Sequence, residues 1–167
     1  MHRVLDEVPV WEPVDAAALP EPPKPLGAGD REEVVARAAA LGLLQVRWPP
    51  RVPTTPAREA MVVADWSRGL GKVVSYSLAA FRQAFNAGAD LTDRDTVLTA
   101  AAGCEIHPRA VVKALEQDRT ARSLDEATAA AVARGVRSVP ALTIGATVVA
   151  GPRAVEDAAR LLGHGDA

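Results

Sequence analysis

The stretch from residue 135 to residue 145 constrains the fold more than any other, because a helix must end and a strand must begin within it. Gly135 is typical of a residue that ends a helix, and the Val139-Pro140 pair is followed by the β-prone residues 141–144. This order predicts a helix that passes the chain into a buried strand through a proline corner. From the residues alone, a trans Pro140 that merely begins the strand is favoured over a cis proline.

After the corner, the pattern of the chain changes from strand to helix. Residues 141–144 and 147–150 are β-prone, and Gly145-Ala146 suits a two-residue type II′ turn, so we predict a β-hairpin. Pro152 is well placed to open a closing helix.

Prolines separate an irregular first third of the chain from a helical remainder, since most of the thirteen prolines lie before residue 57. Residues 8–14 alternate apolar and polar side chains as a short strand, which its two prolines confine to the edge of a sheet. Residues 16–29 predict an extended loop; the alternative is a proline-rich motif that binds a partner protein. Asp30 then matches the cap of a helix over residues 31–41.

The middle of the chain, residues 56–134, is predicted to be helical throughout. Its strongest amphipathic pattern lies between residues 72 and 86, where Val74, Leu78, Phe81 and Phe85 share one helical face. That face is expected to point into the core. Candidate caps indicate the starts of four further helices, at Thr55, at Asp93 or Thr92, at Pro108 and at Ser123.

The composition fits one globular domain with a core. The sequence is 49% hydrophobic and 24% charged, with a net charge of −2. These values exclude the basic surface of a nucleic-acid-binding protein and the composition of a disordered chain. Because no apolar run reaches the length of a membrane span and the N-terminus lacks a secretion signal, we expect a cytoplasmic protein with no membrane or nucleic-acid partner.

Cys104 is the single cysteine, so the sequence holds neither a Cys-x-x-Cys redox pair nor a cysteine zinc cage. No cation or helix N-terminus is evident beside it, which predicts a buried structural cysteine rather than a reactive thiol. The histidines lack the spacing of metal ligands, so no metal is expected. His107, just before Pro108, is expected to cap a helix or to lie on the surface.

The order of edge strand, helical block, proline corner, hairpin and closing helix resembles the DsbA-like thioredoxin-fold family. Within that family, the sequence is most similar to the branch that contains 2-hydroxychromene-2-carboxylate isomerase and the kappa-class glutathione transferases. The matching pieces are residues 76–85, 88–93 and 133–140, together with the segment Trp48-Pro49-Pro50-Arg51-Val52-Pro53.

The resemblance implies an α/β fold, in which a thioredoxin-like sheet carries a large all-helical insertion. The domain organisation expected from it is a thioredoxin-like part at residues 1–29 and 135–163, a helical insertion with flanking helices at residues 30–134, and a frayed tail at residues 164–167.

The resemblance also implies a ligand site at the proline corner. Pro140 would be a cis proline, and the backbone of Val139, after Ser138, would pair with a thiol ligand. The stiff extended segment around Trp48 would line a groove that faces Pro140, with help from Arg51 and Thr54. Arg51 and Thr54 are explained equally well as surface-loop residues.

The sequence departs from the family pattern at its start. Residues 8–14 align with the second strand of the family, so the first strand and the helix that carries the reactive Cys-x-x-Cys or Ser are expected before Met1. The catalytic residue is therefore unknown. A gap in the sheet would leave strand edges without partners, and we expect a homodimer with strand exchange, a rearranged sheet or low stability.

A second departure concerns glutathione. Family members that bind it commonly have a Gly-x-Asp-Arg-like turn before the last helix, whereas this chain has Gly151-Pro152-Arg153-Ala154. A positive charge thus stands where an acid would meet the amino end of glutathione. No cofactor is required, and this turn argues against glutathione, although Arg153 at a helix N-terminus suits an anionic group.

Two hypotheses for the function follow. The first is a DsbA-family protein that is a thiol- or glutathione-dependent isomerase or oxidoreductase by ancestry, without dithiol redox activity. If active, it would be a relative of the isomerases or glutathione transferases rather than a Cys-x-x-Cys oxidase. The second is a non-catalytic binding or assembly protein that uses the corner and the Trp48 groove for a small thiol or hydrophobic ligand.

Overall fold

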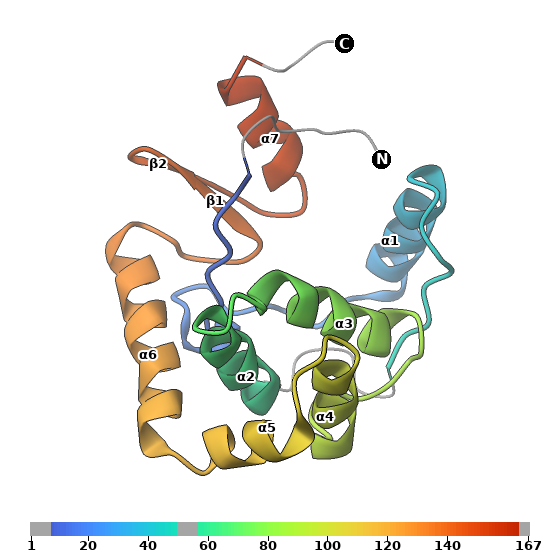
Figure 1. Cartoon of the computed structure of the whole chain (residues 1–167). Helices are drawn as coiled ribbons and strands as arrows, with labels where there is room; N and C mark the ends of the chain where they lie inside the picture. Colours follow the sequence, from blue (N-terminus) through green and yellow to red (C-terminus); the bar gives the residue numbers. More distant parts are fainter. Residues whose placement is uncertain (1–7, 50–56, 164–167) are drawn as a thin grey trace.

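The structure is a computed structural model that describes residues 8–49 and 57–163 (Figure 1). In chain order its elements are the 3-10 helix η1 (Ala16–Ala18), α1 (Ala28–Ala40), α2 (Arg58–Arg68), α3 (Val73–Phe85), α4 (Arg94–Ala102), α5 (Pro108–Leu115), α6 (Asp118–Ala133), the strands β1 (Ala141–Ile144) and β2 (Thr147–Ala150), and α7 (Ala154–Leu161). No helix of this part of the chain is long and apolar enough to cross a membrane.

The helices α2 to α6 form one block, and α6 leads from it into the hairpin of β1 and β2 (Figure 1). Helix α7 packs against both strands. Between residues 57 and 134 the structure contains helices and no strand, as the sequence predicts. The result is a small sheet beside a large helical block, which is the α/β arrangement expected from the sequence.

The predicted hairpin is confirmed in its bounds and register. Strands β1 and β2 are antiparallel, with Ala141 opposite Ala150 and Ile144 opposite Thr147. Gly145 has a φ of 58°, as the first central residue of a type II′ turn requires. Glycine adopts this left-handed value without the steric cost that a side chain would add.

Residues 8–14 do not form the predicted edge strand. They are irregular, and Val8 and Val10 are 82% and 83% exposed. Two prolines remove backbone N–H donors from this segment, and the described strands β1 and β2 pair with each other and not with it. Val14 is nevertheless buried, so the end of the segment packs against the protein without joining a sheet.

Several helix starts also differ from the prediction. Gly27, not Asp30, is the N-cap of α1, and the Asp30 carboxylate accepts a hydrogen bond from the Gly27 N–H at 2.8 Å. Helix α6 begins at Asp118, so Ser123 lies inside it, and α7 begins at Ala154 rather than Pro152. Asp93 caps α4, as expected. The predicted cap at Thr55 lies outside the described residues.

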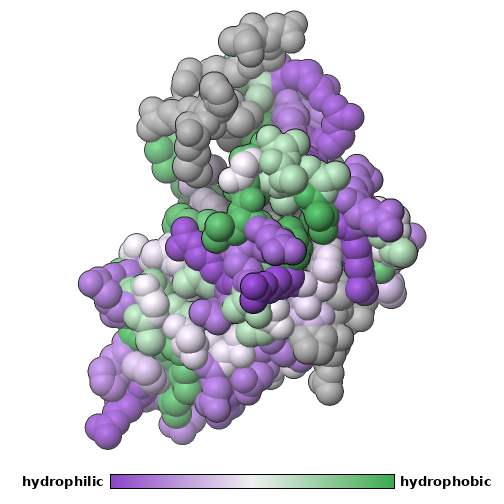
Figure 2. All heavy atoms as spheres, turned by 90° about the vertical axis from the view of Figure 1, so that its right-hand side faces the viewer, coloured by the Kyte–Doolittle hydropathy of each residue, from purple (hydrophilic) through white to green (hydrophobic). Residues whose placement is uncertain are grey.

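The apolar face predicted for α3 is not its buried face. Val74 and Leu78 are each 41% exposed and Phe81 is 50% exposed, whereas the buried residues are Tyr76, Ala80 and Ala84. The small alanines let α3 approach its neighbours closely, while the larger apolar side chains remain at the surface. Figure 2 shows one side of the molecule, on which hydrophobic and hydrophilic atoms are both exposed, with hydrophobic atoms in its upper middle.

Two buried clusters hold the described residues together. The larger lies within the helical block and is made by Ala60, Val63, Ala64, Tyr76, Ala80, Val97, Ala100, Ala101, Cys104, Ile106 and Val111. The smaller joins the N-terminal segment to the end of α6 through Val14, Leu19, Ala131 and Val136, with Ala141 and Val148 of the hairpin against it. The predicted boundaries between the thioredoxin-like and helical parts stay a prediction.

Substitutions should distinguish the true core from the predicted one. Leu124 is fully buried, so Leu124→Ala should lower the free energy of unfolding by about 3 kcal/mol through lost packing and a cavity. Leu78→Ala, on the exposed face of α3, should change it by less than about 0.5 kcal/mol. Urea unfolding measures both. A large loss for Leu78→Ala would show that this face is covered in solution.

Candidate ligand site

The proline corner begins where α6 ends. Gly135 has a φ of 95°, which ends the helix in a conformation that a larger residue would adopt with strain. Val136 then enters the smaller buried cluster, and its N–H donates to the Ala131 carbonyl at 3.0 Å. The first residues of the corner are thereby fixed to α6.

The Pro-rich N-terminal segment holds the corner from the other side. The Glu21 N–H donates to the Arg137 carbonyl at 2.9 Å, and the Arg137 guanidinium donates to the Glu21 carboxylate at 2.8 Å. Both side chains are largely exposed, so the ion pair adds little to stability by itself. The backbone bond fixes the position of the corner relative to this segment.

The next residues form the candidate site itself. Ser138 is half-buried, Pro140 is exposed, and Val139 is 36% exposed, and no hydrogen bond between described residues uses the backbone N–H or C=O of Val139. The Val139–Pro140 peptide bond is cis. The Pro140 carbonyl accepts a hydrogen bond from the Gly151 N–H at 2.8 Å, so the chain after β2 returns directly beside the corner.

That return brings Arg153 to the same end of the hairpin. Arg153 is exposed and occupies the N-cap position of α7, where the positive end of the helix dipole adds to its charge. The corner and the turn at residues 151–153 therefore lie side by side, and together they present a backbone edge and a cation.

Helix α1 contributes a contact that sequence reasoning missed. The Arg37 guanidinium donates to the Pro152 carbonyl at 2.7 Å and forms an ion pair with Glu156 in the first turn of α7. A backbone N–H and the Arg37 cation lower the pKa of Glu156. Helix α1 is thus clamped to α7 beside the site. No local pattern signals this contact, since its partners lie more than a hundred residues apart.

The structure does not bring Trp48 to the corner. Its ring packs edge-on against Phe85, with 6.1 Å between centroids, and the Arg31 guanidinium lies 5.6 Å from its centre. Nothing in the described contacts of Trp48 reaches residues 138–140. Trp48 instead joins α1 to the C-terminal end of α3. Arg51 and Thr54 lie outside the described residues.

Cys104 is buried in the helical block, as predicted, and is 8% exposed. Its thiol hydrogen-bonds to the Ala101 carbonyl at 3.1 Å, and burial raises its pKa, an effect that the nearby Lys72 offsets only in part. The thiol is thereby kept protonated and poorly nucleophilic at neutral pH.

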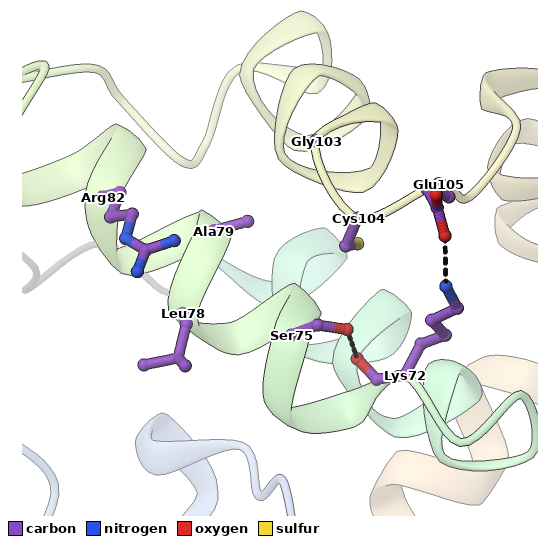
Figure 3. Close-up of a pocket in the computed structure, with 8 residues that line it drawn as sticks. All are labelled: Lys72, Ser75, Leu78, Ala79, Arg82, Gly103, Cys104 and Glu105. Atoms are coloured by element: carbon purple, nitrogen blue, oxygen red, sulfur yellow. Dashed lines mark hydrogen bonds and ion pairs between the residues drawn. The ribbon is translucent and has the colours of Figure 1, made fainter.

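Cys104 lines a shallow cavity of about 400 Å³ between α3 and the end of α4 (Figure 3). Lys72 reaches across its rim to the Glu105 carboxylate at 3.1 Å, and the Ser75 hydroxyl donates to the Lys72 carbonyl. The cavity belongs to the helical block and includes none of residues 138–140 or 151–153.

No group of three or more His, Cys, Asp and Glu side chains in residues 8–49 and 57–163 could hold a metal ion. His107 caps α5, since its Nδ1 accepts a hydrogen bond from the Arg109 N–H at 3.1 Å. This is one of the two roles expected for it. The chemistry that the described residues offer at the corner is recognition by a backbone edge, with Arg137 paired to Glu21 and Arg153 exposed on the neighbouring turn.

Comparison with protein families gives a match over most of the chain. The model of a DSBA-like thioredoxin domain matches residues 25–163. A comparison with curated protein sequences found no match. The family match covers the corner, the hairpin, the helical block and α7.

The clamp between α1 and α7 predicts a pH-dependent stability. Arg37→Met should lower the free energy of unfolding at pH 7 by about 1 kcal/mol, because one ion pair and one hydrogen bond are lost. The ion-pair contribution is complete above pH 4.5, the ordinary pKa of Glu156, and is lost as the pH falls through the lowered folded-state pKa. The variant and the wild type should thus converge only in part in acid, because the hydrogen bond from Arg37 to the Pro152 carbonyl does not titrate.

Urea unfolding between neutral and acidic pH checks this convergence. Arg160→Met is the matched control, because the Arg160 partner, Asp157, lies in the same helix and ties nothing to α1. A pH-independent difference for Arg37→Met would contradict a role for the Glu156 charge.

Cys104 should resist thiol reagents in the folded protein. Because the sulfur is buried and hydrogen-bonded, its reaction with a disulfide reagent such as Ellman's reagent should be roughly a hundredfold slower than in the denaturant-unfolded chain. Time-resolved absorbance gives both rates. Equal rates would mean that Cys104 is accessible in solution.

Proposed function

Because the chain belongs to the DSBA-like thioredoxin-domain family, we propose that it binds a small thiol-containing ligand at the corner of Val139 and Pro140. The observation that carries this proposal is that Val139 is partly exposed and its backbone groups make no hydrogen bond with the described residues, next to the turn that carries Arg153. A ligand with an extended peptide-like part and an anionic group has a backbone edge and a cation to bind there.

We further propose that the protein has no dithiol redox activity of its own. The 167 residues contain one cysteine, and its thiol is buried in the helical block. Dithiol exchange needs two thiols that approach one another, and an accessible thiolate to start it. Any thiol chemistry at the corner would depend on the sulfur of the ligand or on a group supplied by another segment.

Within the family, the branch of 2-hydroxychromene-2-carboxylate isomerase and the kappa-class glutathione transferases is the favoured relationship. Its support is the similarity of residues 76–85, 88–93 and 133–140 to that branch, together with the absence of a Cys-x-x-Cys pair from the sequence. By this ancestry, the reaction would be a thiol-dependent isomerisation or transfer. Arg153 favours an anionic thiol over one recognised through its amino group.

A non-catalytic binding or assembly protein is the second candidate. The observation that favours it is the exposed apolar row of Val74, Leu78 and Phe81 on α3. A hydrophobic ligand near Trp48 would quench its fluorescence, and Trp48→Phe should abolish that quenching. A ligand at the corner should leave Trp48 unaffected, because Trp48 has no described contact there.

Calorimetric titration with glutathione tests the first candidate, because glutathione offers a thiol, peptide groups and carboxylates, although the turn before α7 lacks the acid that would meet its amino end. We expect heat of binding at millimolar affinity or tighter. Arg153→Ala should weaken the affinity about twofold to fivefold, as loss of one exposed charge interaction predicts. Arg109→Ala is the matched control, since Arg109 lies in α5 and its described hydrogen bond, from its backbone N–H to His107, does not reach the corner.

Three outcomes separate the alternatives. Absence of any binding heat would contradict the proposal and favour the second candidate. Equal effects of Arg153→Ala and Arg109→Ala on the affinity would show that Arg153 does not take part in binding glutathione. Thiol-driven insulin reduction clearly above background would contradict the proposed lack of dithiol activity.

A further inference from the structure

The proline-rich segment between η1 and α1 has no role in the candidate ligand site beyond the contact of Glu21 with Arg137. Residues 20, 22, 23 and 25 are prolines, and every residue from 20 to 27 is exposed. The family match begins at residue 25, so most of this segment lies before it. Its sequence is consistent with a plain loop or with a motif that binds a partner protein.

The prolines restrict this segment to an extended conformation. A proline ring fixes φ near about −65°, and the residue before a proline is held in the extended region. Pro22 and Lys24 both precede a proline, and residues 22–27 accordingly adopt neither helix nor strand. Gly27, at the end of the segment, has a φ of −69° and a ψ of 174°. These are the constraints of a polyproline II helix.

The side chains of a polyproline II helix form three ridges, because it has about three residues per turn. The ridges of this segment are Pro22 with Pro25, Pro23 with Leu26, and Glu21 with Lys24 and Gly27. Two of the three ridges are thus apolar, and the third carries the charges.

The charged ridge is attached to the protein at both ends. The Glu21 N–H donates to the Arg137 carbonyl at 2.9 Å, and the Gly27 N–H donates to the Asp30 carboxylate at 2.8 Å. No hydrogen bond between described residues uses the carbonyl groups of residues 22–26. The two apolar ridges and these carbonyls are therefore exposed on a segment whose ends are already fixed.

Fixed ends and prolines both favour binding. A flexible segment loses conformational freedom when a partner orders it, and this loss weakens the affinity. Residues 22–26 have few conformations to lose, since proline restricts the backbone in the free protein as well. The segment is consequently preorganised for a partner that binds polyproline II helices.

We propose that residues 22–26 bind a partner protein through a groove lined with aromatic side chains. Segments with the spacing Pro-x-x-Pro, as in Pro22 and Pro25, pack into such grooves, and Trp and Tyr can donate hydrogen bonds to the carbonyls. Glu21 is paired with Arg137, whereas Lys24 has no ion-pair partner among the described residues. A carboxylate beside the groove would match the positive charge of Lys24.

The partner is a different protein rather than a second copy of this chain. The cavity beside Cys104 has no aromatic residue in its lining. Tyr76 is buried, and the Trp48 ring packs against Phe85 within the fold. These aromatic side chains are therefore not arranged as a groove for residues 22–26.

Calorimetric titration of the full-length protein with purified SH3 and WW domains tests the proposal, because both kinds of domain bind Pro-x-x-Pro segments. We expect at least one of them to bind with a dissociation constant below about 0.5 mM. Pro25→Ala should weaken that binding about fivefold to twentyfold, because it removes one side chain of an apolar ridge and frees the backbone of Lys24.

Pro108→Ala is the matched control, because Pro108 is also exposed but lies in the first turn of α5. It should leave the affinity unchanged. A second variant, Lys24→Glu, retains every proline and keeps the test decisive if Pro25→Ala does not fold. It should weaken the binding about threefold to tenfold, and more at low salt, whereas Lys113→Glu in α5 should not.

Three outcomes would overturn the proposal. The first is that none of these domains binds at concentrations up to about 1 mM. The second is that Pro25→Ala and Pro108→Ala change the affinity equally. The third is that Lys24→Glu binds as tightly as the wild type. This proposal does not rest on the proposed ligand, so Pro25→Ala should keep its heat of binding with glutathione.

Discussion

The buried carboxylate of Asp15 is the interaction on which the arrangement of this chain most depends. It is 7% exposed and accepts hydrogen bonds from the Ala17 N–H and, at 2.5 Å, from the guanidinium of Arg58, while its own N–H donates to the Thr128 hydroxyl at 2.9 Å. Arg58 also bonds to Asp125, and these two carboxylates raise the pKa of its guanidinium. Loss of Arg58 would leave a buried charge without its cation, which costs far more than the pair itself contributes.

This network helps to fix the position of the proline corner, although none of its residues belongs to the corner. The segment before η1 has no strand ladder to hold it, so Asp15 attaches it to α2 and α6. Val14 and Leu19, on either side of Asp15, are thereby held against Val136 at the start of the corner. The candidate site is consequently built on a polar contact in the helical block rather than on a continuous sheet.

The parts of the structure that sequence predicts well are those set by local chemistry. The hairpin, the cap at Asp93 and the buried Cys104 each follow from a few neighbouring residues. Predictions failed where contacts between residues far apart in the sequence determine which side chains are buried or paired. The face of α3 was misassigned because periodicity shows which residues share a face but not which face has neighbours, and alanines can fill a close contact better than Leu78 or Phe81. Likewise, no spacing in the sequence indicates that Arg37 binds α7 or that Arg58 binds Asp15.

The single thiol and the proline corner lie in different parts of the described structure. Cys104 is buried among α2 to α5, where it lines a shallow cavity and has a raised pKa, whereas the corner offers backbone groups and, on the neighbouring turn, the Arg153 cation, but no thiol. The cavity that Cys104 lines includes none of residues 138–140 or 151–153, so the thiol and the proline corner do not share a pocket among the described residues. The buried thiol and the exposed backbone of the corner therefore belong to different parts of the described structure.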